Sequence, residues 1–304
     1  MDSSLVTSLL TDITDSTGRP RATRRPVRVW SMSGVERLTF PDGTTAIFKY
    51  ATEPFASEDQ ILRSAGQRGI PVPQVFGAIV RDDVLGMVIE DLGDPECGAL
   101  DAEGVVAAVA LHQADPDPAL PVLDTDALAA LPVLALGHLG RLREAGRWTE
   151  ETEDLTAGLE ALAEVAAKRA AGAELAPFGW VHSEFHPTSL HLGTGGWRLL
   201  DFARAFTGPG LLDLVSWHGT VARPDPDHLR TFIEAYVGAG GHQDALAERG
   251  GLEPEAWALG WHRVWVVEWF LEQAVRWINE PDQDPAYIRA VRRHLETALQ
   301  YLET

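Results

Sequence analysis

The feature that most constrains the fold is a change of sequence pattern at Gly93. Before it, the short β-prone runs VRVW, VERLTF and TAIFKY alternate with turn residues, and Asp42-Gly43 is a hairpin turn signal. After it, long alanine- and leucine-rich stretches carry helical periodicity, interrupted by a strand-like patch near residue 180. The pattern therefore predicts an α+β protein with a sheet-rich first part and a mainly helical second part.

Three segments are expected from this pattern. Residues 1–26 contain Ser/Thr/Asp clusters and then an arginine-rich stretch, which predicts an N-terminal tail made of a frayed helix and a tether. Residues 27–93 contain five expected strands, with one helix in SEDQILRSAGQRG after the third strand. Residues 94–304 form the helical part, and the glycines at 238, 240 and 241 are read as a loop.

Composition limits the possible partners. The formal net charge of −20 argues against nucleic-acid binding, because a phosphate backbone requires a basic surface. The acidity is explained either by a general solubility bias or by steering of a cationic substrate. We find no signal-peptide pattern and no run of roughly 18 apolar residues, so we expect a cytoplasmic protein with no membrane partner. The single cysteine, Cys97, excludes an internal disulfide, and nothing in the sequence sets the oligomeric state.

Lysine usage singles out one strand residue. Of the 25 basic residues only Lys49 and Lys168 are lysines. Lys168 lies in AAKRAA on an expected helix, where an exposed lysine is unremarkable, whereas Lys49 lies in the β-prone run TTAIFKY. We interpret Lys49 as a position that requires a compact ammonium on a flexible stem and not a planar guanidinium.

The segment around residue 190 gathers oxygen-bearing side chains. Leu190–Leu192 and Trp197–Leu200 flank the turn sequence GTGG, which predicts a hairpin with Ser189 and Asp201 at its open end. Glu184 lies five residues before Ser189. Such ligands suit Mg²⁺, which takes one or two carboxylates and completes its shell with phosphate and water.

Two other interpretations of this segment stay open. One is a surface hairpin with incidental polar residues. The other is a transition-metal site formed by His182, Glu184 and His186 on one face of a strand, although Pro187 would break that strand.

Taken in order, these motifs resemble those of the aminoglycoside phosphotransferase and small-molecule kinase family. The family's catalytic loop reads approximately H-G-D-x-H-P-x-N, and residues 182–189 here read HSEFHPTS. Its metal motif resembles LDF at residues 200–202 followed by GPGLLDL at 208–214, and its L-H motif resembles Leu111-His112. Trp30–Arg37 resembles the phosphate-covering turn and Val88–Leu92 the hinge that receives adenine.

The resemblance covers about residues 27–235. It implies a two-lobed protein-kinase-like fold, with a small antiparallel β-sheet N-lobe containing one helix and a larger, mainly helical C-lobe. It also implies an ATP- or GTP-dependent phosphotransferase that uses Mg²⁺ and acts on a hydroxyl of a small molecule or peptide. The implied residues are catalytic Glu184 and Lys49, nucleotide-binding Lys49, Glu58, Ser33, Gly34, Glu90 and Leu92, and metal-binding Asp201 and Ser189.

Two positions depart from the family pattern. Glu184 stands where the family has aspartate, which adds one C–C bond, about 1.5 Å of reach. Ser189 stands where the family has asparagine, and its hydroxyl is a shorter and weaker metal ligand. The alternative function is therefore a pseudokinase-like module that binds a nucleotide or a partner without phosphotransfer.

A stripe of tryptophans near the C-terminus is a candidate wall of the pocket for the phosphate acceptor. Four tryptophans at 257, 261, 265 and 269 recur every four residues of an expected helix, which also carries Glu268. The stripe is either the core face of that helix or an aromatic, acidic wall for a cationic ligand. The resemblance implies that the acceptor pocket includes part of 255–280, so the candidate pocket residues are Glu184, His186, Trp265, Glu268 and Trp269.

Overall fold

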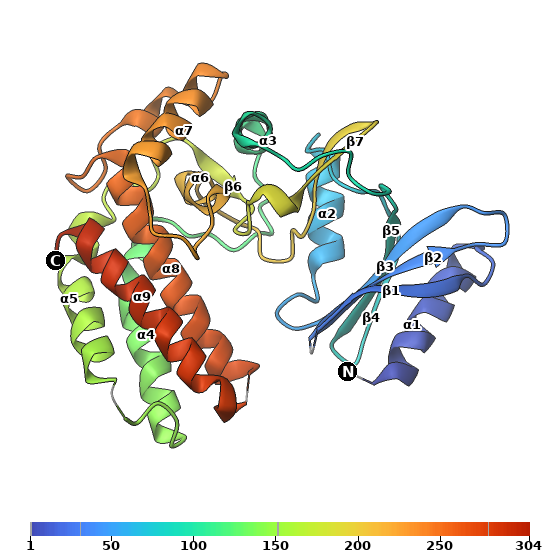
Figure 1. Ribbon diagram of the computed structural model, residues 1–304, viewed down its shortest axis with the longest axis horizontal. Coiled ribbons are helices and arrows are strands. Elements are labelled where there is room, and N and C mark those ends of the chain that lie inside the picture. Colours follow the sequence, from blue (N-terminus) through green and yellow to red (C-terminus); the bar gives the residue numbers. More distant parts are fainter. Residues whose placement is uncertain (1, 31, 151, 279) are drawn as a thin grey trace. The chain divides into compact units, whose positions relative to one another are not determined.

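The computed structural model describes residues 2–30, 32–150, 152–278 and 280–304. The chain divides into two compact units (Figure 1). Unit 1 consists of Met1–Asp117 and His182–Ala205, and unit 2 of Pro118–Val181 and Phe206–Thr304. The boundaries of these units differ from those of the expected segments 1–26, 27–93 and 94–304, and the expected segments stay a prediction. Every helix among the described residues is too short or too polar to span a lipid bilayer.

Unit 1 is built on a five-stranded antiparallel sheet in the order β1-β2-β3-β5-β4. The strands are β1 (Thr23–Val29), β2 (Ser33–Thr39), β3 (Thr45–Thr52), β4 (Val75–Arg81) and β5 (Val84–Glu90). Helix α2 (Glu58–Gln67) follows β3, and α3 (Asp101–Gln113) follows β5. The expected α+β class, with one helix inserted after the third strand, is confirmed.

The turn at Asp42-Gly43 sets the register of β2 and β3. Gly43 has a φ of +84°, which suits glycine, and the paired strands begin with Thr39 opposite Thr45. Val35 then lies opposite Lys49 and Arg37 opposite Ile47. Because side chains alternate along a strand, these four share one face of the sheet.

Helix α1 (Ser3–Ser16) differs from the expected frayed tail. Leu9 and Ile13 are fully buried in the core that α1 forms with the strands, and the helix lies along the sheet in Figure 1. Two glycines of the sheet permit this close approach: a Cβ on Gly77 would lie 2.8 Å from Ile13 Cγ2, and one on Gly86 would lie 3.0 Å from Leu9 Cβ. The first segment is therefore a packed part of unit 1.

The predicted hairpin near residue 190 is present in unit 1. It consists of β7 (Leu190–Gly193) and β8 (Gly196–Leu199), preceded by a 3₁₀ turn, η1 (Pro187–Ser189). Leu192 pairs with Trp197, and the Leu200 N–H donates to the Ser189 carbonyl at 2.9 Å. The open end of the hairpin thus brings Ser189 next to the residue before Asp201.

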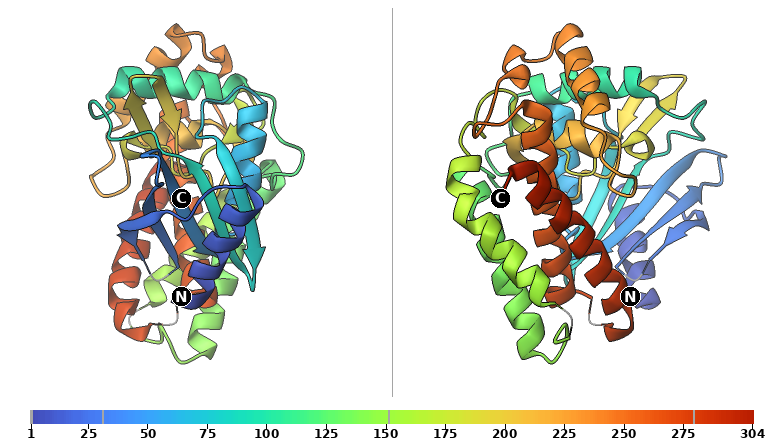
Figure 2. Two further views of the ribbon diagram at one scale, coloured as in Figure 1. Left: turned by 90° about the vertical axis from the view of Figure 1, so that its right-hand side faces the viewer. Right: turned by 60° about the vertical axis from the view of Figure 1, so that its left-hand side comes forward.

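Unit 2 is mainly helical. Four long helices pack side by side (Figure 2): α4 (Thr125–Glu144), α5 (Glu153–Arg169), α8 (Pro254–Arg276) and α9 (Asp284–Leu302). The remaining elements are β6 (Phe178–Val181) paired with β9 (Phe206–Pro209), the helices α6 (Leu211–Trp217) and α7 (Pro226–Gly238), and the 3₁₀ turns η2 (Gln243–Leu246) and η3 (Pro281–Gln283).

Candidate functional site

Lys49 is the centre of a charge network in unit 1. Its Nζ lies 2.7 Å from Glu58 Oε1 and 2.6 Å from Asp201 Oδ1. Glu58, in the first turn of α2, is 1% exposed, and Lys49 is also buried. Three residues that the sequence analysis singled out separately therefore meet at one point.

The carboxylates fix the charge of this lysine. Burial lowers the pKa of Lys49, but the attraction of Glu58 and Asp201 outweighs burial and holds that pKa above its ordinary value. The Lys49 ammonium lowers the pKa of Asp201 to about 2, against the opposing effect of burial. Burial raises the pKa of Glu58, and Lys49 opposes that rise. An ammonium and an Asp201 carboxylate therefore coexist across the neutral pH range.

Asp201 has an unusual backbone conformation. Its φ is +60°, in the left-handed region that aspartate tolerates better than most residues. A second cation lies near this carboxylate: Arg28 Nη2 is 4.0 Å from Asp201 Oδ2. Left-handed residues of this kind cluster at functional sites.

A cavity of about 340 Å³ lies beside the network, entirely within unit 1. Apolar side chains from three strands, Val35, Ile47 and Ile89, form part of its wall. Lys49 and Asp201 form another part. A cavity with an apolar wall and a few convergent charges is the usual form of a small-molecule site.

The chain after β5 borders the same cavity. Glu90 and Leu92, which the sequence analysis assigned to the hinge, both line it. The Glu90 N–H donates to the Gln74 carbonyl at 2.8 Å, which ties the end of β5 to the residue before β4. Asp91 Oδ1 accepts a hydrogen bond from Arg37 Nη2 at 3.2 Å, and Asp91 Oδ2 lies 2.9 Å from Arg37 Nε, which fixes the turn. Within the described residues the Leu92 backbone makes no hydrogen bond, so its polar groups are available to a ligand.

His182 braces the segment that resembles the catalytic loop. Its Nε2 lies 2.7 Å from the Leu200 carbonyl, and the Glu184 N–H donates to its Nδ1 at 3.3 Å. These two contacts fit the tautomer in which Nε2 carries the proton and Nδ1 accepts. The ring links the backbone of Glu184 to the residue before Asp201.

Ser189 and Glu184 lie on the loop but do not line the described cavity, whereas Thr188 and Asp201 do. The Ser189 hydroxyl donates to the Glu184 carbonyl at 2.8 Å, and Ser189 is 1% exposed. Glu184 is half-buried. His186 Nδ1 lies 2.8 Å from the Thr188 hydroxyl oxygen, and burial lowers the pKa of His186. Ser189 thus ties the loop together in this structure.

Two of the expected nucleotide-binding residues do not line the cavity. Ser33 and Gly34 begin β2 and are not among its lining residues. A Cβ on Gly34 would lie 2.2 Å from the Tyr50 ring, so this glycine makes room for a side chain of β3. Ser31, within the segment that resembles the phosphate-covering turn, lies outside the described residues.

The tryptophan stripe of α8 divides into a buried and a half-buried part. Trp257 and Trp261 are fully buried, and their Nε1 atoms donate to the Arg169 carbonyl at 2.7 and 3.1 Å. Trp265 and Trp269 are half-buried. Trp257 and Trp261 therefore belong to the buried core face of α8.

Glu268, the acidic candidate for the acceptor pocket, contacts α4. Its Oε1 lies 3.0 Å from His138 Nε2, and Arg141 Nη2 lies 2.8 Å from the other ring nitrogen of His138. The carboxylate thereby helps to hold α4 against α8 within unit 2. The acceptor-pocket assignment stays a prediction.

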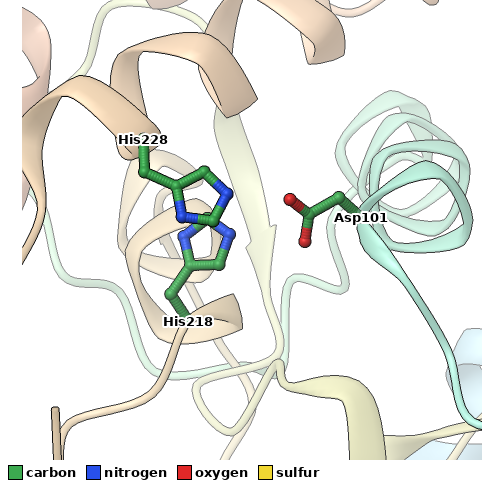
Figure 3. Close-up of side chains that lie close together, drawn as sticks. All are labelled: Asp101, His218 and His228. Atoms are coloured by element: carbon green, nitrogen blue, oxygen red, sulfur yellow. The ribbon is translucent and has the colours of Figure 1, made fainter.

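Two histidines of unit 2 stack on each other (Figure 3). His218 follows α6 and His228 lies in α7, and their ring centroids are 3.9 Å apart. Asp101, also labelled in Figure 3, belongs to unit 1. The His218 ring also meets Phe232 of α7 edge-on at 5.1 Å. This aromatic contact packs α6 against α7.

Sequence reasoning did not find two arginines of the cavity wall. Arg28 of β1 and Arg37 of β2 both line the cavity, and Arg28 also lies over the Trp30 ring at 3.9 Å. For Arg37 a signal existed, because the Asp42-Gly43 turn sets β2 and β3 in register and places Arg37 on the same face as Lys49. No comparable turn signal precedes β1.

Solved structures share this fold. A macrolide 2′-phosphotransferase from Brachybacterium faecium is 16% identical, with a TM-score of 0.63 and coverage of 93% of this chain and 97% of that one. An amicoumacin kinase in complex with AMP-PNP, Ca²⁺ and Ami is 14% identical, with a TM-score of 0.60 and coverage of 97% and 94%. A choline kinase from Cryptosporidium parvum is 10% identical, with a TM-score of 0.62 and coverage of 96% and 91%. The expected protein-kinase-like fold is confirmed.

The family assignment comes from the sequence itself. A comparison with curated proteins gives no match. The chain matches the phosphotransferase enzyme family over residues 38–250, which is more than half of its length and includes Lys49, Glu58 and Asp201. The chain therefore belongs to the phosphotransferase enzyme family.

Proposed function

We propose that this protein transfers the γ-phosphate of ATP or GTP to a hydroxyl of a small molecule or peptide. The observation that carries the proposal is the Lys49 ammonium, held between Glu58 and Asp201 on the wall of a cavity in unit 1. Phosphoryl transfer needs positioned cations and a metal-binding carboxylate more than it needs covalent chemistry. A nucleotide as donor agrees with the cytoplasmic location expected from the sequence.

The cavity offers distinct places for the base and the phosphates. The apolar wall of Val35, Ile47 and Ile89 suits a flat aromatic base, and the free backbone groups of Leu92 suit its polar edge. Lys49 and Arg28 supply the positive charge that the phosphates require. Arg28 would take over part of the role that the resemblance gave to Ser33 and Gly34.

Asp201 is the residue that would hold Mg²⁺. Its Oδ1 is engaged by Lys49, and its Oδ2 lies 4.0 Å from Arg28, so one oxygen is left for a hard cation. The metal, when bound, would neutralise charge on the phosphates. Ser189 donates its proton to a backbone carbonyl, which favours a single metal site based on Asp201.

Glu184 is the candidate general base. A carboxylate at this position would accept the proton of the acceptor hydroxyl as the phosphate is transferred. His182 fixes the backbone of Glu184 from one side and Ser189 from the other. The longer glutamate side chain therefore extends from a constrained loop.

Two observations favour a second candidate, a nucleotide-binding module without phosphotransfer. Ser189 binds the loop backbone where the family has a metal-ligating asparagine, and Glu184 changes the reach of the base. A displacement of about 1 Å can lower the rate on the order of 100-fold.

Nucleotide binding is tested by thermal unfolding with the two lysines as a matched pair. Saturating MgATP should raise Tm by about 5 °C, because a ligand at 100 times its Kd stabilises by about 2.7 kcal/mol. Lys49→Ala should abolish the rise, and Lys168→Ala, at an exposed position of α5, should preserve it. No rise in the wild type with MgATP or MgGTP would reject both candidates.

Transfer is tested with γ-labelled ATP and a panel of hydroxyl compounds that includes an aminoglycoside, a macrolide and choline. Label transferred by the wild type but not by Glu184→Gln, with MgATP binding retained in both, supports the enzyme. Binding without transfer across the panel, and without nucleotide hydrolysis, supports the binding module.

A further inference from the structure

A second cavity, of about 230 Å³, lies entirely within unit 2. Its wall combines the loop at residues 220–224 with side chains of α8 and α9. Three of the lining residues are arginines: Arg223 from the loop, Arg263 from α8 and Arg293 from α9. None of the described lining residues is an aspartate or a glutamate. In a chain with a formal charge of −20, this concentration of positive charge requires an explanation.

Arg263 is the buried member of the cluster. It is 2% exposed, its Nη2 donates to the Gly219 carbonyl at 3.3 Å, and its Nη1 lies 3.4 Å from His262 Nδ1. Over the part of the chain that the structure describes, no carboxylate lies within 4.0 Å of the side-chain nitrogens of Arg223, Arg263 or Arg293. Buried charges in proteins are normally paired, so the buried Arg263 guanidinium lacks its counter-charge among the described residues.

The neighbour of Arg293 shows the contrast. Arg292, the preceding residue of α9, pairs with Asp154 through Nη2 and Oδ1 at 3.1 Å. Asp225, which follows the lining loop directly, has its carboxylate engaged as the N-cap of α7, where it accepts from the His228 N–H at 3.0 Å. Arg292 is therefore paired, and the Asp225 carboxylate is engaged at the start of α7.

The electrostatics agree with the geometry. Burial, and next the repulsion from Arg293, lower the pKa of Arg263 to about 10. Burial and the two arginines also lower the pKa of His294 to about 3, so this lining imidazole is neutral. Its Nε2 lies 3.4 Å from Arg293 Nη2 and can accept from it. The guanidinium groups repel one another, and an anion between them would remove that repulsion.

We propose that this cavity binds the phosphate group of a small molecule. Guanidinium groups donate paired hydrogen bonds in a planar fork that matches the oxygens of a phosphate. The cavity volume is several times the roughly 30 Å³ that one water occupies, so a phosphate group and part of its substituent fit. None of its lining residues belongs to the Lys49 cavity, so this site stands independently of the proposed nucleotide pocket.

The first test measures binding of inorganic phosphate by calorimetry and by thermal unfolding, against NaCl of equal ionic strength. Phosphate should bind the wild type and raise its Tm beyond the NaCl control. Arg223→Gln and Arg293→Gln remove exposed side chains and should each weaken binding about tenfold, because one charge-assisted hydrogen bond is lost. Arg289→Gln, one turn earlier on α9 and also exposed, should leave the affinity unchanged.

The second test separates this site from the Lys49 cavity, which could also bind phosphate. Lys49→Ala should keep the wild-type affinity for phosphate, whereas Arg293→Gln should weaken phosphate binding about tenfold and keep the MgATP response. Weaker phosphate binding in Lys49→Ala, together with unchanged phosphate binding in Arg293→Gln, would overturn the inference. A wild-type protein that responds to MgATP but not to phosphate would also overturn it. A stronger response to acetate than to phosphate would overturn the assignment to a phosphate group.

Discussion

The two units bury positive charge in opposite ways. In unit 1 the Lys49 ammonium contacts two carboxylates, and its pKa rises. In unit 2 the Arg263 guanidinium is 2% exposed without such a partner, and its pKa falls to about 10 because of burial and Arg293. Both cations line cavities.

This difference separates two kinds of site. Lys49 and its carboxylates form a network that the protein completes by itself and that can accept a phosphate together with a metal cation. The arginine cluster is incomplete without an anion. The buried charges of this protein therefore indicate different ligands for the two units, and substitutions can test each one separately.

The largest effect is expected for the carboxylate that would hold the metal. Asp201→Asn should lower the phosphate-transfer rate about 10³-fold, because it removes the charge that positions the metal against the phosphates. Asp94→Asn is the matched control, since Asp94 lines the same cavity but its side chain is 91% exposed. Initial rates at saturating MgATP measure both. Equal rates in the two variants would show that Asp201 has no part in transfer.

A smaller effect is expected at the candidate base. Glu184→Gln should lower kcat about 10²-fold with little change in nucleotide affinity, because it removes the proton acceptor and keeps the side-chain length. Glu184→Asp restores the residue of the family and tests the reach of the carboxylate. An unchanged kcat in Glu184→Gln contradicts the role of Glu184.

Stability should respond to the loss of one carboxylate in unit 1. Glu58→Gln should lower the free energy of unfolding by about 3 kcal/mol, because it leaves the buried Lys49 ammonium with one carboxylate in place of two. Denaturant unfolding measures the change, with Asp59→Asn of the same helical turn as control. A loss below that of the control would mean that Asp201 alone compensates the lysine.

Acid should destabilise unit 2 through His294. Its pKa in the folded protein is about 3, below the ordinary 6.5, so below pH 6.5 the unfolded state binds a proton that the folded state does not. The free energy of unfolding should therefore fall as the pH drops from 6.5 towards 3, by up to about 1.4 kcal/mol per pH unit. His294→Gln should flatten this dependence in Tm measurements at pH 7.5 and 5.5. Parallel pH curves for both proteins would rule out this contribution.

The smallest effect is expected for Arg263, the buried cation without a carboxylate partner among the described residues. Arg263→Met keeps much of the side-chain volume and removes an unpaired buried charge, so it should change stability by less than about 1 kcal/mol without phosphate, and in the stabilising direction. It should also abolish the response to phosphate. A large destabilisation would show that the contacts of Arg263 to Gly219 and His262 already compensate its charge.

Much of unit 1 could be predicted because its signals are local. Turn residues and alternating strands gave the five-stranded sheet, and the GTGG turn gave the hairpin that ends at Asp201. Helix α1 was misjudged because its Ser/Thr/Asp content suggested a frayed segment. Its buried residues 6, 9, 10 and 13 have amphipathic spacing, yet only the sheet, with Gly77 and Gly86 facing the helix, supplies the surface they cover.

The cavity walls could be predicted only in part. Arg37 was missed although the register of β2 and β3 could have placed it, whereas Arg28 lies on β1, where an irregular pairing between Pro26 and Arg28 disturbs simple alternation. The arginine cluster of unit 2 had no motif at all. Its members lie at positions 223, 263 and 293, and each one read by itself is an ordinary basic residue.

The sequence by itself determined the order of the elements, the family, and the acids and lysine that belong together, because turn chemistry, periodicity and motif spacing act over a few residues. Only the tertiary structure decided which charges are paired. Lys49 and Asp201 lie 152 residues apart in the chain, and their 2.6 Å contact depends on the packing between them. A charge gains or loses its partner through folding, since electrostatic energy depends on distance and burial and not on separation along the chain.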